Sequence, residues 1–519
     1  MKNFNFWNHP WSMSLTAAIL LSISYPPFDF GILQIPAFIL LFRVTVISSG
    51  IRQMILYTYP ALALWNLLVT YWLMMATVSG GIAAILANAL LMVIPLILIR
   101  KLFLSQLNPI MVSLVAAAVW VSYEFLHHNW DLAWPWLTLG NGWSNLTGAT
   151  QFISVTGVFG ISFWIVFTSA LLYKYLEEPV KPILYSGLLV FFAFPIFSVL
   201  ATITVQQTES KPIEVAIIQP NFDSYQRFGG LSSLSEVTDK LLTLSAETIT
   251  ENTQLIIWPE NAFDSSMPYQ NQYFDRIQDS LRVWDTELIT GSGFLEYFDD
   301  EEIRPAVVRE SLDGRPFKIF NAAFHIRPES DHDIYRKGKL VPAVERLPFV
   351  EFFQKIDLFG WVNWGNLMGY GLGRDANNFR INSHKTPALI CYDSVFPGWV
   401  NRFVDDGADF LTIITNDGWW GDSNGHIQHF AYARLRAIEQ RRWIARSANN
   451  GISGIISPDG KVQMETEYWT EDAFTFTIYS NDRKTFYARH GEWFGQLMLF
   501  ISAAGFLLYG FKRKNRGLK

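Results

Sequence analysis

Long apolar segments recur through the first 205 residues, and one more lies near the C-terminus. They cover residues 12–25, 33–48, 54–75, 81–100, 109–127, 153–173, 183–205 and 494–511. Most of them approach the ~20 residues that a helix needs to cross the hydrocarbon core of a membrane. The pattern therefore predicts a polytopic α-helical membrane domain with about eight spans. Seven lie in residues 1–205, and residues 491–519 form the last span and a basic cytoplasmic tail.

Between these two parts, residues 206–490 show a different pattern. Short β-like runs alternate there with polar and amphipathic helical stretches. The predicted strands are 213–219, 254–258, 287–291, 318–325, 387–391, 409–415, 452–457 and 473–478, and the predicted helices are 233–250, 270–284 and 426–441. This alternation is typical of an α/β domain whose strands are buried.

The basic residues between the apolar segments separate into two sets of loops. One set carries Arg43, Arg52, Arg100, Lys101, Lys174 and Lys181, and Lys2 and the C-terminal tail belong with it. The alternate loops near 26–32, 76–80 and 128–150 have no lysine or arginine. Cytoplasmic loops carry the excess of basic residues, so we expect both termini in the cytoplasm and residues 206–490 on the far side. In a bacterium this is an inner-membrane protein with a periplasmic domain.

Composition supports the membrane assignment and argues against nucleic-acid binding, disulfides and thiolate metal clusters. Half of the residues are hydrophobic and 17% are charged, against roughly 25% in average soluble domains. The net charge of −6 argues against nucleic-acid binding, which needs a basic patch. The single cysteine, Cys391, excludes an intrachain disulfide and a thiolate metal cluster. His426 and His429 have helical spacing but no clear further ligand, so we expect them to pack or to form hydrogen bonds.

Three residues with matching chemistry lie at the ends of apolar runs or beside an apolar turn. Glu260 ends Trp258-Pro-Glu260, Lys337 ends Tyr335-Arg-Lys337, and Cys391 follows an apolar run. A buried carboxylate can act as the base for a thiol, and a nearby lysine can lower the thiol pKa or stabilise an oxyanion. Together the three would make an acyl-transfer site. Taken singly, each could be a surface charge or a core thiol.

These segments resemble the nitrilase, or carbon–nitrogen hydrolase, superfamily. The matching pieces occur in the family's order at residues 215–219, 258–260, 335–342, 390–392, 415–422, 428–430, 434–439, 446–452 and 458–460. The resemblance implies an αββα sandwich in which Glu260 is the general base, Lys337 stabilises the oxyanion and Cys391 is the nucleophile. It gives Glu345, Tyr392 and Asp393 supporting roles, and it implies no metal and no cofactor.

With its membrane segments and its Trp134-to-Gly140 loop, the whole chain resembles the apolipoprotein N-acyltransferase family. That resemblance implies a membrane phospholipid as acyl donor, a cysteine thioester, and a diacylglyceryl apolipoprotein as acceptor, and we expect a monomer. Two departures concern substrate fit and rate. Ala343-Val344 replaces the family's Phe-Gly, and Asp393 replaces its glutamate.

Two other functions remain open from the residues alone. A membrane-tethered amidase would use the same three residues with water on a small substrate, and a divergent relative would be non-catalytic. Two aromatic segments also allow two interpretations. Residues 128–150 suit a membrane interface or a lipid-facing wall, and residues 346–364 suit a core or a membrane-dipping lid.

Overall fold

The computed structural model describes most of the chain, in two compact units. The described residues are 6–203, 211–263, 271–300, 304–305, 307–329, 332–356, 359, 361–362 and 364–517. Lys2 and the last two residues, which enter the orientation prediction, lie outside them. The first unit comprises Met1–Gln206, Ser423–Glu439 and Thr485–Lys519, and the second comprises Gln207–Asp422 and Gln440–Lys484.

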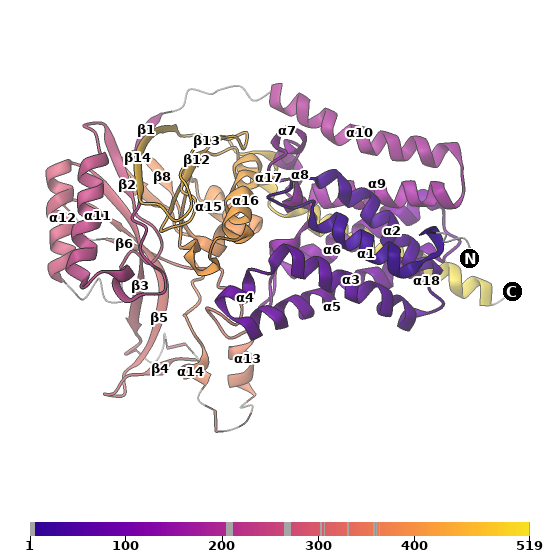
Figure 1. Cartoon of the computed structure of the whole chain (residues 1–519), viewed down its shortest axis with the longest axis horizontal. Helices are drawn as coiled ribbons and strands as arrows, with labels where there is room; N and C mark the ends of the chain where they lie inside the picture. The colour runs from indigo at the N-terminus through magenta and orange to yellow at the C-terminus, as the bar shows by residue number, and fades with distance from the viewer. Residues whose placement is uncertain are drawn as a thin grey trace. The chain divides into compact units, whose positions relative to one another are not determined.

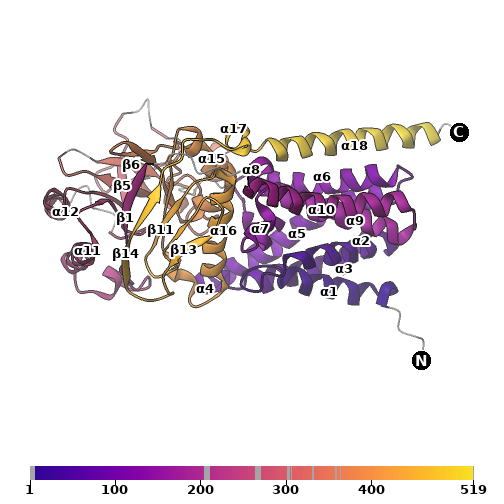
Figure 2. The same cartoon turned by 90° about the horizontal axis from the view of Figure 1, so that it is seen from above.

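The first unit contains one helix for each predicted apolar segment, and Figure 2 shows most of these helices running in roughly the same direction. They are α1 (Pro10–Ser22), α2 (Gln34–Ile47), α3 (Ile51–Thr70), α5 (Val78–Phe103), α6 (Pro109–His127), α9 (Phe159–Glu177), α10 (Lys181–Ile203) and α18 (Trp493–Gly517). Among the described residues, five helices are long and apolar enough to cross a membrane, namely α5, α6, α9, α10 and α18. The helices α1 and α2 are shorter. The first unit therefore has the helical, membrane-compatible character that the apolar pattern predicts.

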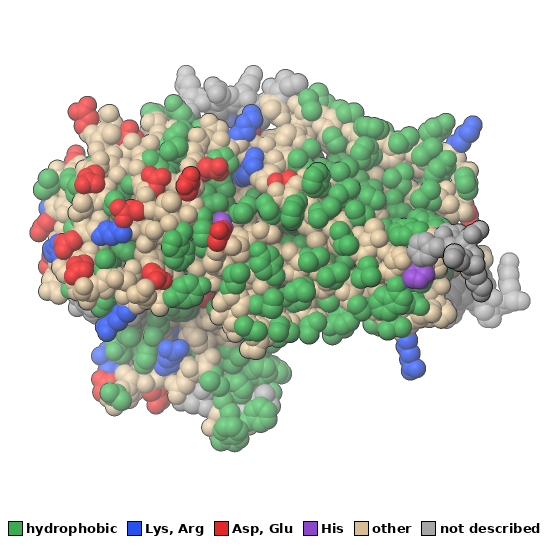
Figure 3. All heavy atoms as spheres, in the orientation of Figure 1, with side chains coloured by type: hydrophobic (Ala, Val, Ile, Leu, Met, Phe, Trp, Pro, Cys, Tyr) green, Lys and Arg blue, Asp and Glu red, His purple; other side chains and the backbone are tan. Residues whose placement is uncertain are grey.

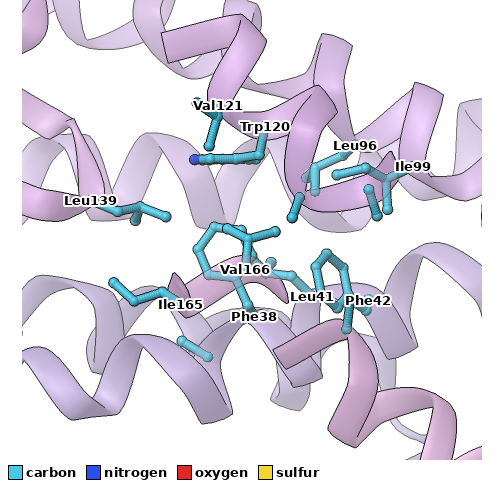
Figure 4. Close-up of a cluster of buried hydrophobic side chains, with 14 of the residues drawn as sticks. Phe38, Leu41, Phe42, Leu96, Ile99, Trp120, Val121, Leu139, Ile165 and Val166 are labelled. Atoms are coloured by element: carbon cyan, nitrogen blue, oxygen red, sulfur yellow. The ribbon is translucent and has the colours of Figure 1, made fainter. Parts of the chain in front are cut away.

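Aromatic and branched aliphatic side chains fill the core of this unit. Figure 4 shows Phe38 of α2 facing Trp120 of α6, with Phe42 of the same helix below Leu96 and Ile99 of α5. The Phe38 and Trp120 rings meet edge to face, with centroids 4.7 Å apart, a geometry that aromatic pairs prefer. The outer surface is apolar as well: hydrophobic side chains cover most of the visible face over these helices in Figure 3. Leu189 on α10 is 71% exposed. A helix that is apolar on both sides is typical of a membrane span.

The loop at 128–150 is more deeply buried than an interfacial segment would be. It forms the short helices η3 (Pro135–Leu137), η4 (Leu139–Trp143) and the beginning of the α7–α8 segment (Thr147–Thr150 and Ile153–Thr156). Trp136 is 1% exposed, and its Nε1 donates to Gln428 Oε1 at 2.7 Å. Trp72 Nε1 donates to the same oxygen at 3.2 Å. The indole N–H of Trp136 can be buried because a tertiary partner satisfies it, so this tryptophan belongs to the core.

That partner lies on α16 (Asn424–Gln440), whose residues up to Glu439 group with the membrane helices. Gln428 Nε2 donates to the carbonyl oxygens of Pro26 and Val69, each at 3.1 Å. His429 on the same helix packs against Trp136, with ring centroids 5.8 Å apart. The amide of Gln428 therefore links four separate parts of the membrane unit.

The second unit contains two packed β-sheets (Figure 1). The first has the order β14-β1-β2-β3-β5-β4, with β6 also paired to β5, and the second has the order β13-β12-β11-β10-β9. The bounds of the first sheet are β1 (Pro212–Gln219), β2 (Thr253–Ile257), β3 (Glu287–Tyr297), β4 (Arg309–Glu310), β5 (Pro316–Ile326), β6 (Asp333–Arg336) and β14 (Asp472–Tyr479). Those of the second are β9 (Ala388–Ile390), β10 (Leu411–Thr415), β11 (Ile444–Ala448), β12 (Gly454–Ile456) and β13 (Val462–Glu465). A separate hairpin pairs β7 (Phe379–Ile381) with β8 (His384–Thr386).

Helices enclose the two sheets. Helices α11 (Leu234–Thr248) and α12 (Asn271–Trp284) cover one face of the first sheet in Figure 1 and share a hydrophobic core with β1, β2 and β5. Ser447 of the second sheet donates its hydroxyl to the carbonyl of Ile218 in the first at 2.8 Å. Helix α15 (Pro397–Asp405) lies beyond the second sheet. This arrangement confirms the predicted nitrilase-like sandwich with mixed sheets.

All eight predicted strands are present, but the pattern missed several others. The most central of these is β11, whose sequence Ile-Ala-Arg-Ser-Ala carries polar residues although all five positions are buried. Arg446 within it pairs with Asp417 at 2.7 Å, and both side chains are fully buried. The Arg446 charge can be buried because Asp417, which is distant in the chain, compensates it. The hydrophobic pattern therefore does not reveal that this strand is buried.

The segment 346–364 includes a core part and an exposed part. Val350 of α13 (Val350–Lys355) and Trp364 of α14 (Trp364–Leu367) are buried in a small cluster with Val307 and Met368. Phe352 is 57% exposed and Trp361 is 86% exposed. Residues 357, 358, 360 and 363 of this segment lie outside the described residues.

Candidate active site

Glu260 lies directly after β2, where the backbone still follows the neighbouring strand. Its Oε1 accepts a hydrogen bond from Asn321 Nδ2 at 2.7 Å, and its Oε2 accepts from the backbone N–H of Asn416 at 2.9 Å. A Cβ at Gly291 of β3 would lie 2.6 Å from the Glu260 Cα. Only glycine allows the strand to pass so close, so Gly291 helps to define where the carboxylate stands.

Lys337 follows β6 and is 1% exposed. Its ammonium donates to Glu260 Oε1 at 3.2 Å and to Glu345 Oε1 at 2.8 Å. Burial alone lowers the pKa of Lys337, but the charges of Glu260 and Glu345 outweigh it and raise the pKa above its usual value. Lys337 is therefore a permanently charged cation held between two carboxylates.

Cys391 is the first residue of the 3-10 helix η7 (Cys391–Val395), immediately after β9. Its φ of +46° lies in the left-handed region, which non-glycine residues rarely adopt. Such strain persists where the surrounding structure imposes it, and it is frequent at functional sites. The sharp turn places a side chain that is 8% exposed at the end of a buried strand.

Asp393 stabilises this turn. Its Oδ2 accepts from the Ile390 N–H at 3.1 Å and from the Tyr335 hydroxyl at 2.8 Å. Its Oδ1 accepts from the Lys339 N–H at 2.7 Å. Burial raises the pKa of Asp393 to about 7, although Lys337 and these hydrogen bonds lower it. The shorter aspartate thus holds the cysteine turn against the lysine segment.

The protein environment raises the pKa of both the Cys391 thiol and the Glu260 carboxyl. Burial and the charge of Glu260 raise the pKa of Cys391 well above its usual value, and Lys337 lowers it without offsetting them. The expected lowering by lysine is present but is outweighed. Burial also raises the pKa of Glu260, against the effect of Lys337. At rest the sulfur therefore carries its proton, and Glu260 is a stronger base than an exposed glutamate.

The remaining predicted residues surround this group. Glu345 Oε2 accepts from the Val341 N–H at 2.8 Å, and its Oε1 also accepts from Asn321 at 3.2 Å. Tyr392 is 3% exposed and packs edge to face on Phe396, with ring centroids 4.9 Å apart. Glu260, Lys337 and Cys391 are within electrostatic reach of one another, so the structure brings the predicted residues together.

Two contributors were not singled out from the sequence. Asn321 bonds both carboxylates from the middle of β5, and a lone asparagine in an apolar strand was its only signal. Asp417 accepts from Thr415 Oγ1 at 2.7 Å and pairs with Arg446. One of its carboxylate oxygens lies within 4.8 Å of the Cys391 sulfur. Asn321 therefore fixes the two carboxylates around Lys337, and Asp417 adds a further carboxylate near the thiol.

A cavity of about 580 Å³ adjoins these residues. Glu345 and Asn416 line it directly, together with Asn261, Tyr370 and Arg309. Its wall also includes apolar residues, among them Phe222, Phe263, Leu234, Val237 and Ile319. Asn261 is the chain neighbour of Glu260, and Glu345 binds Lys337, so the cavity reaches the surroundings of these two residues. A pocket with an apolar wall and a few polar groups can hold an acyl group and its carbonyl.

Comparison with known proteins matches both units. Residues 17–171 match the apolipoprotein N-acyltransferase N-terminal domain, and residues 214–486 match the carbon–nitrogen hydrolase family. An apolipoprotein N-acyltransferase from Chlorobaculum tepidum is 31% identical over 510 residues, which cover 93% of each chain. One from Geobacter metallireducens is 25% identical over 532 residues, covering 97% of this chain and 95% of the relative.

Among solved structures, a carbon–nitrogen hydrolase superfamily protein from Xanthomonas campestris is similar, with 18% identity and a TM-score of 0.35. The similarity covers 56% of this chain and 97% of that one.

Proposed function

The chain belongs to the apolipoprotein N-acyltransferase family, and we propose that Cys391 carries a fatty acyl chain from a membrane phospholipid to the N-terminal amine of diacylglyceryl apolipoproteins. The observation that carries this proposal is the buried group of Glu260, Lys337 and Cys391 beside a cavity with apolar walls. The same chain supplies helices that can lie in the membrane where both substrates are anchored.

In the first half-reaction Glu260 takes the proton of the Cys391 thiol. The sulfur attacks an ester carbonyl of the phospholipid, and the Lys337 ammonium stabilises the oxyanion that forms. Collapse breaks the carbon–oxygen bond to the glycerol. The leaving alkoxide takes the proton back from Glu260, giving a lysophospholipid and a thioester on Cys391.

In the second half-reaction the α-amine of the diacylglyceryl-cysteine attacks the thioester. A carbon–nitrogen bond forms and the carbon–sulfur bond breaks. Glu260 takes a proton from the amine and returns it to the sulfur, which restores the resting thiol. The raised pKa of Glu260 suits a group that must both accept and give a proton.

The arrangement in the membrane is part of the proposal. Residues 1–205 and 491–519 hold the protein in the bacterial inner membrane, and residues 206–490 form a periplasmic catalytic domain. Both termini are cytoplasmic, and the enzyme acts as a monomer. The distribution of Arg43, Arg52, Arg100 and Lys101 supports this orientation. Reporter fusions after residue 30 and after residue 104 should report opposite sides of the membrane.

A two-step assay tests the function. The purified protein is incubated with a phospholipid labelled in its acyl chain, the lipid is removed, and a diacylated lipopeptide is added. We expect label to pass from the protein to the peptide amine. Release of free fatty acid alone would instead indicate a hydrolase, and the absence of label on the protein would indicate a non-catalytic relative.

Cys391→Ala should abolish labelling of the protein. Cys391→Ser is the matched variant, because it replaces the sulfur with a smaller nucleophilic oxygen and should give a slower, hydroxylamine-resistant ester. Label that persists on the Cys391→Ala protein would contradict the assignment of the nucleophile.

A further inference from the structure

Arg309 is a cation in the wall of the cavity described above. It lies on the short strand β4 and lines the same cavity as Glu345 and Tyr370. Its Nη2 donates to the carbonyl of Gly369 at 3.2 Å. Its Nε is fully buried and has no hydrogen-bond partner. Within the described part of the chain, no carboxylate forms an ion pair with this guanidinium.

The other charges of the cavity are already compensated or solvated. Glu345 is bound to Lys337 and to the Val341 N–H. Asp223 accepts from the Tyr225 N–H at 2.9 Å and from Gln226 Nε2 at 2.7 Å. Arg227 is exposed, with its guanidinium stacked on Phe228 at 4.5 Å. Arg309 therefore stands out as the half-buried cation whose charge nothing within the cavity wall balances.

A half-buried guanidinium with unused donors fits an anion that can accept two parallel hydrogen bonds. Arginine presents its donors in a planar fork that matches a phosphate or a carboxylate, and pairs with such anions are stronger than neutral hydrogen bonds. The proposed donor, a glycerophospholipid, carries a phosphate a few bonds from its ester carbonyl. The proposed acceptor has a diacylglyceryl thioether in that place and no phosphate.

We propose that Arg309 is the phosphate-binding residue of the acyl-donor site. This inference rests on the proposed function and adds to it the feature by which the cavity distinguishes donor from acceptor. Burial raises the pKa of the Tyr370 phenol, as do the charges of Glu345 and Glu260, whereas Lys337 and Arg309 lower it. The guanidinium is thus within electrostatic reach of a side chain that adjoins the reacting groups. A phosphate bound there would hold the neighbouring ester on the side of the cavity where Glu260 and Lys337 lie.

The test compares two acyl donors that differ in the phosphate. A diacyl phospholipid and a diacylglycerol with the same acyl chains are presented to the full-length protein in non-ionic detergent micelles. The rate constant kcat/KM for thioester formation on Cys391 is measured for each donor. We expect the wild-type protein to prefer the phospholipid. Arg309→Gln should lower the ratio of the two values about tenfold to a hundredfold, the loss expected for a hydrogen-bonded charge pair.

Two further variants separate a specific role from loss of charge or of fold. Arg309→Lys keeps the positive charge but lacks the planar pair of donors, so it should lower the ratio of the two kcat/KM values less than Arg309→Gln does. Arg315→Gln is the matched control: Arg315 lies on the same hairpin, outside the cavity lining, and pairs with Asp299 at 2.7 Å. It should leave the ratio unchanged. A ratio that is the same in Arg309→Gln and in the wild type, or a wild-type protein without preference, would overturn the inference.

The outcomes also keep this inference apart from the proposed function. If the wild-type protein forms no thioester with either donor, the proposed function fails. If it forms the thioester but the Arg309→Gln substitution does not change the ratio, only the assignment of the phosphate site fails. Adding inorganic phosphate, with chloride at equal ionic strength as control, identifies the source of the anion. If phosphate inhibits thioester formation in the wild type but not in Arg309→Gln, the site binds free phosphate as well. If Arg309→Gln lowers the ratio of the two kcat/KM values but phosphate does not inhibit the wild type, the site binds phosphate only within a lipid.

Discussion

Replacing Lys337 with methionine removes a buried cation while keeping a side chain of similar length. In the structure the Lys337 ammonium lies 3.2 Å from Glu260 Oε1 and 2.8 Å from Glu345 Oε1, and it is 1% exposed. The variant leaves two carboxylates that share a hydrogen-bond donor, Asn321, with no cation between them. Breaking a buried charge pair by removing one partner costs about 3–5 kcal/mol.

The cost of this substitution should depend on pH in a definite direction. Burial already raises the pKa of Glu260, and removing Lys337 raises it further, because Lys337 is the cation that lowers it. A carboxyl whose pKa is raised by folding loses stability as pH rises from its unfolded to its folded pKa, by about 1.4 kcal/mol per pH unit. The difference in stability between the wild type and Lys337→Met should therefore be small near pH 5 and grow toward pH 8.

Thermal unfolding followed by tryptophan fluorescence in detergent measures this difference. At pH 8 we expect the Tm of Lys337→Met to lie roughly 10 °C below that of the wild type, at 2–4 °C per kcal/mol. Thioester formation should fall by at least about a hundredfold, as when one oxyanion donor is removed. Lys339→Met is the matched control, since Lys339 is partly exposed and stacks over Phe396 at 4.8 Å. A gap in Tm that does not change with pH would refute the reasoning.

Three further substitutions test other parts of the structure. Gln428→Leu removes four hydrogen bonds of one buried amide, two from indole N–H groups and two to backbone carbonyls, so we expect a loss of about 3 kcal/mol; an unchanged Tm of the membrane unit would contradict this. Gly338→Ala places a Cβ 1.9 Å from the Trp399 ring and should destabilise the protein by about 1–3 kcal/mol, whereas Gly148→Ala, with open space around it, should not. Asp393 has its pKa raised to about 7 by burial, so its ionisation destabilises the fold as pH rises. The Tm of the wild type relative to Asp393→Asn should fall between pH 5 and pH 8, and parallel profiles would exclude the effect.

The fold could be predicted from the sequence wherever the hydrophobic pattern reports burial directly. The eight apolar segments and the eight predicted strands are all present as helices and strands. The pattern failed where a polar residue is buried with a distant partner. The charged Arg446 interrupts the hydrophobic pattern of the central strand β11, so the pattern does not predict this strand. Gln428 allows Trp136 to lie in the core, although the tryptophans of its loop suited a membrane interface or a lipid-facing wall.

The candidate site likewise has residues that the sequence predicts and residues that only the folded chain reveals. Motifs at strand ends led to Glu260, Lys337 and Cys391, because each chemical group stands next to an apolar run. Asn321 has no such signal, and its importance lies in two hydrogen bonds that only the folded chain brings together. The left-handed backbone of Cys391 likewise depends on the packing around it. The role of Asp393 depends on the fold in the same way, because its carboxylate joins the Ile390 N–H, just before the cysteine, to the Lys339 N–H of the lysine segment.

Mapping the acyl group by mass spectrometry tests the central claim most directly. The wild-type protein is incubated with a phospholipid, digested under acidic conditions and examined for peptides that have gained one fatty acyl chain. We expect a single acylated peptide, the one containing Cys391, whose adduct neutral hydroxylamine removes. We also expect that Glu260→Gln greatly slows the appearance of this adduct. An acyl group on any other residue, or an adduct that forms equally fast without the Glu260 carboxylate, would contradict the account.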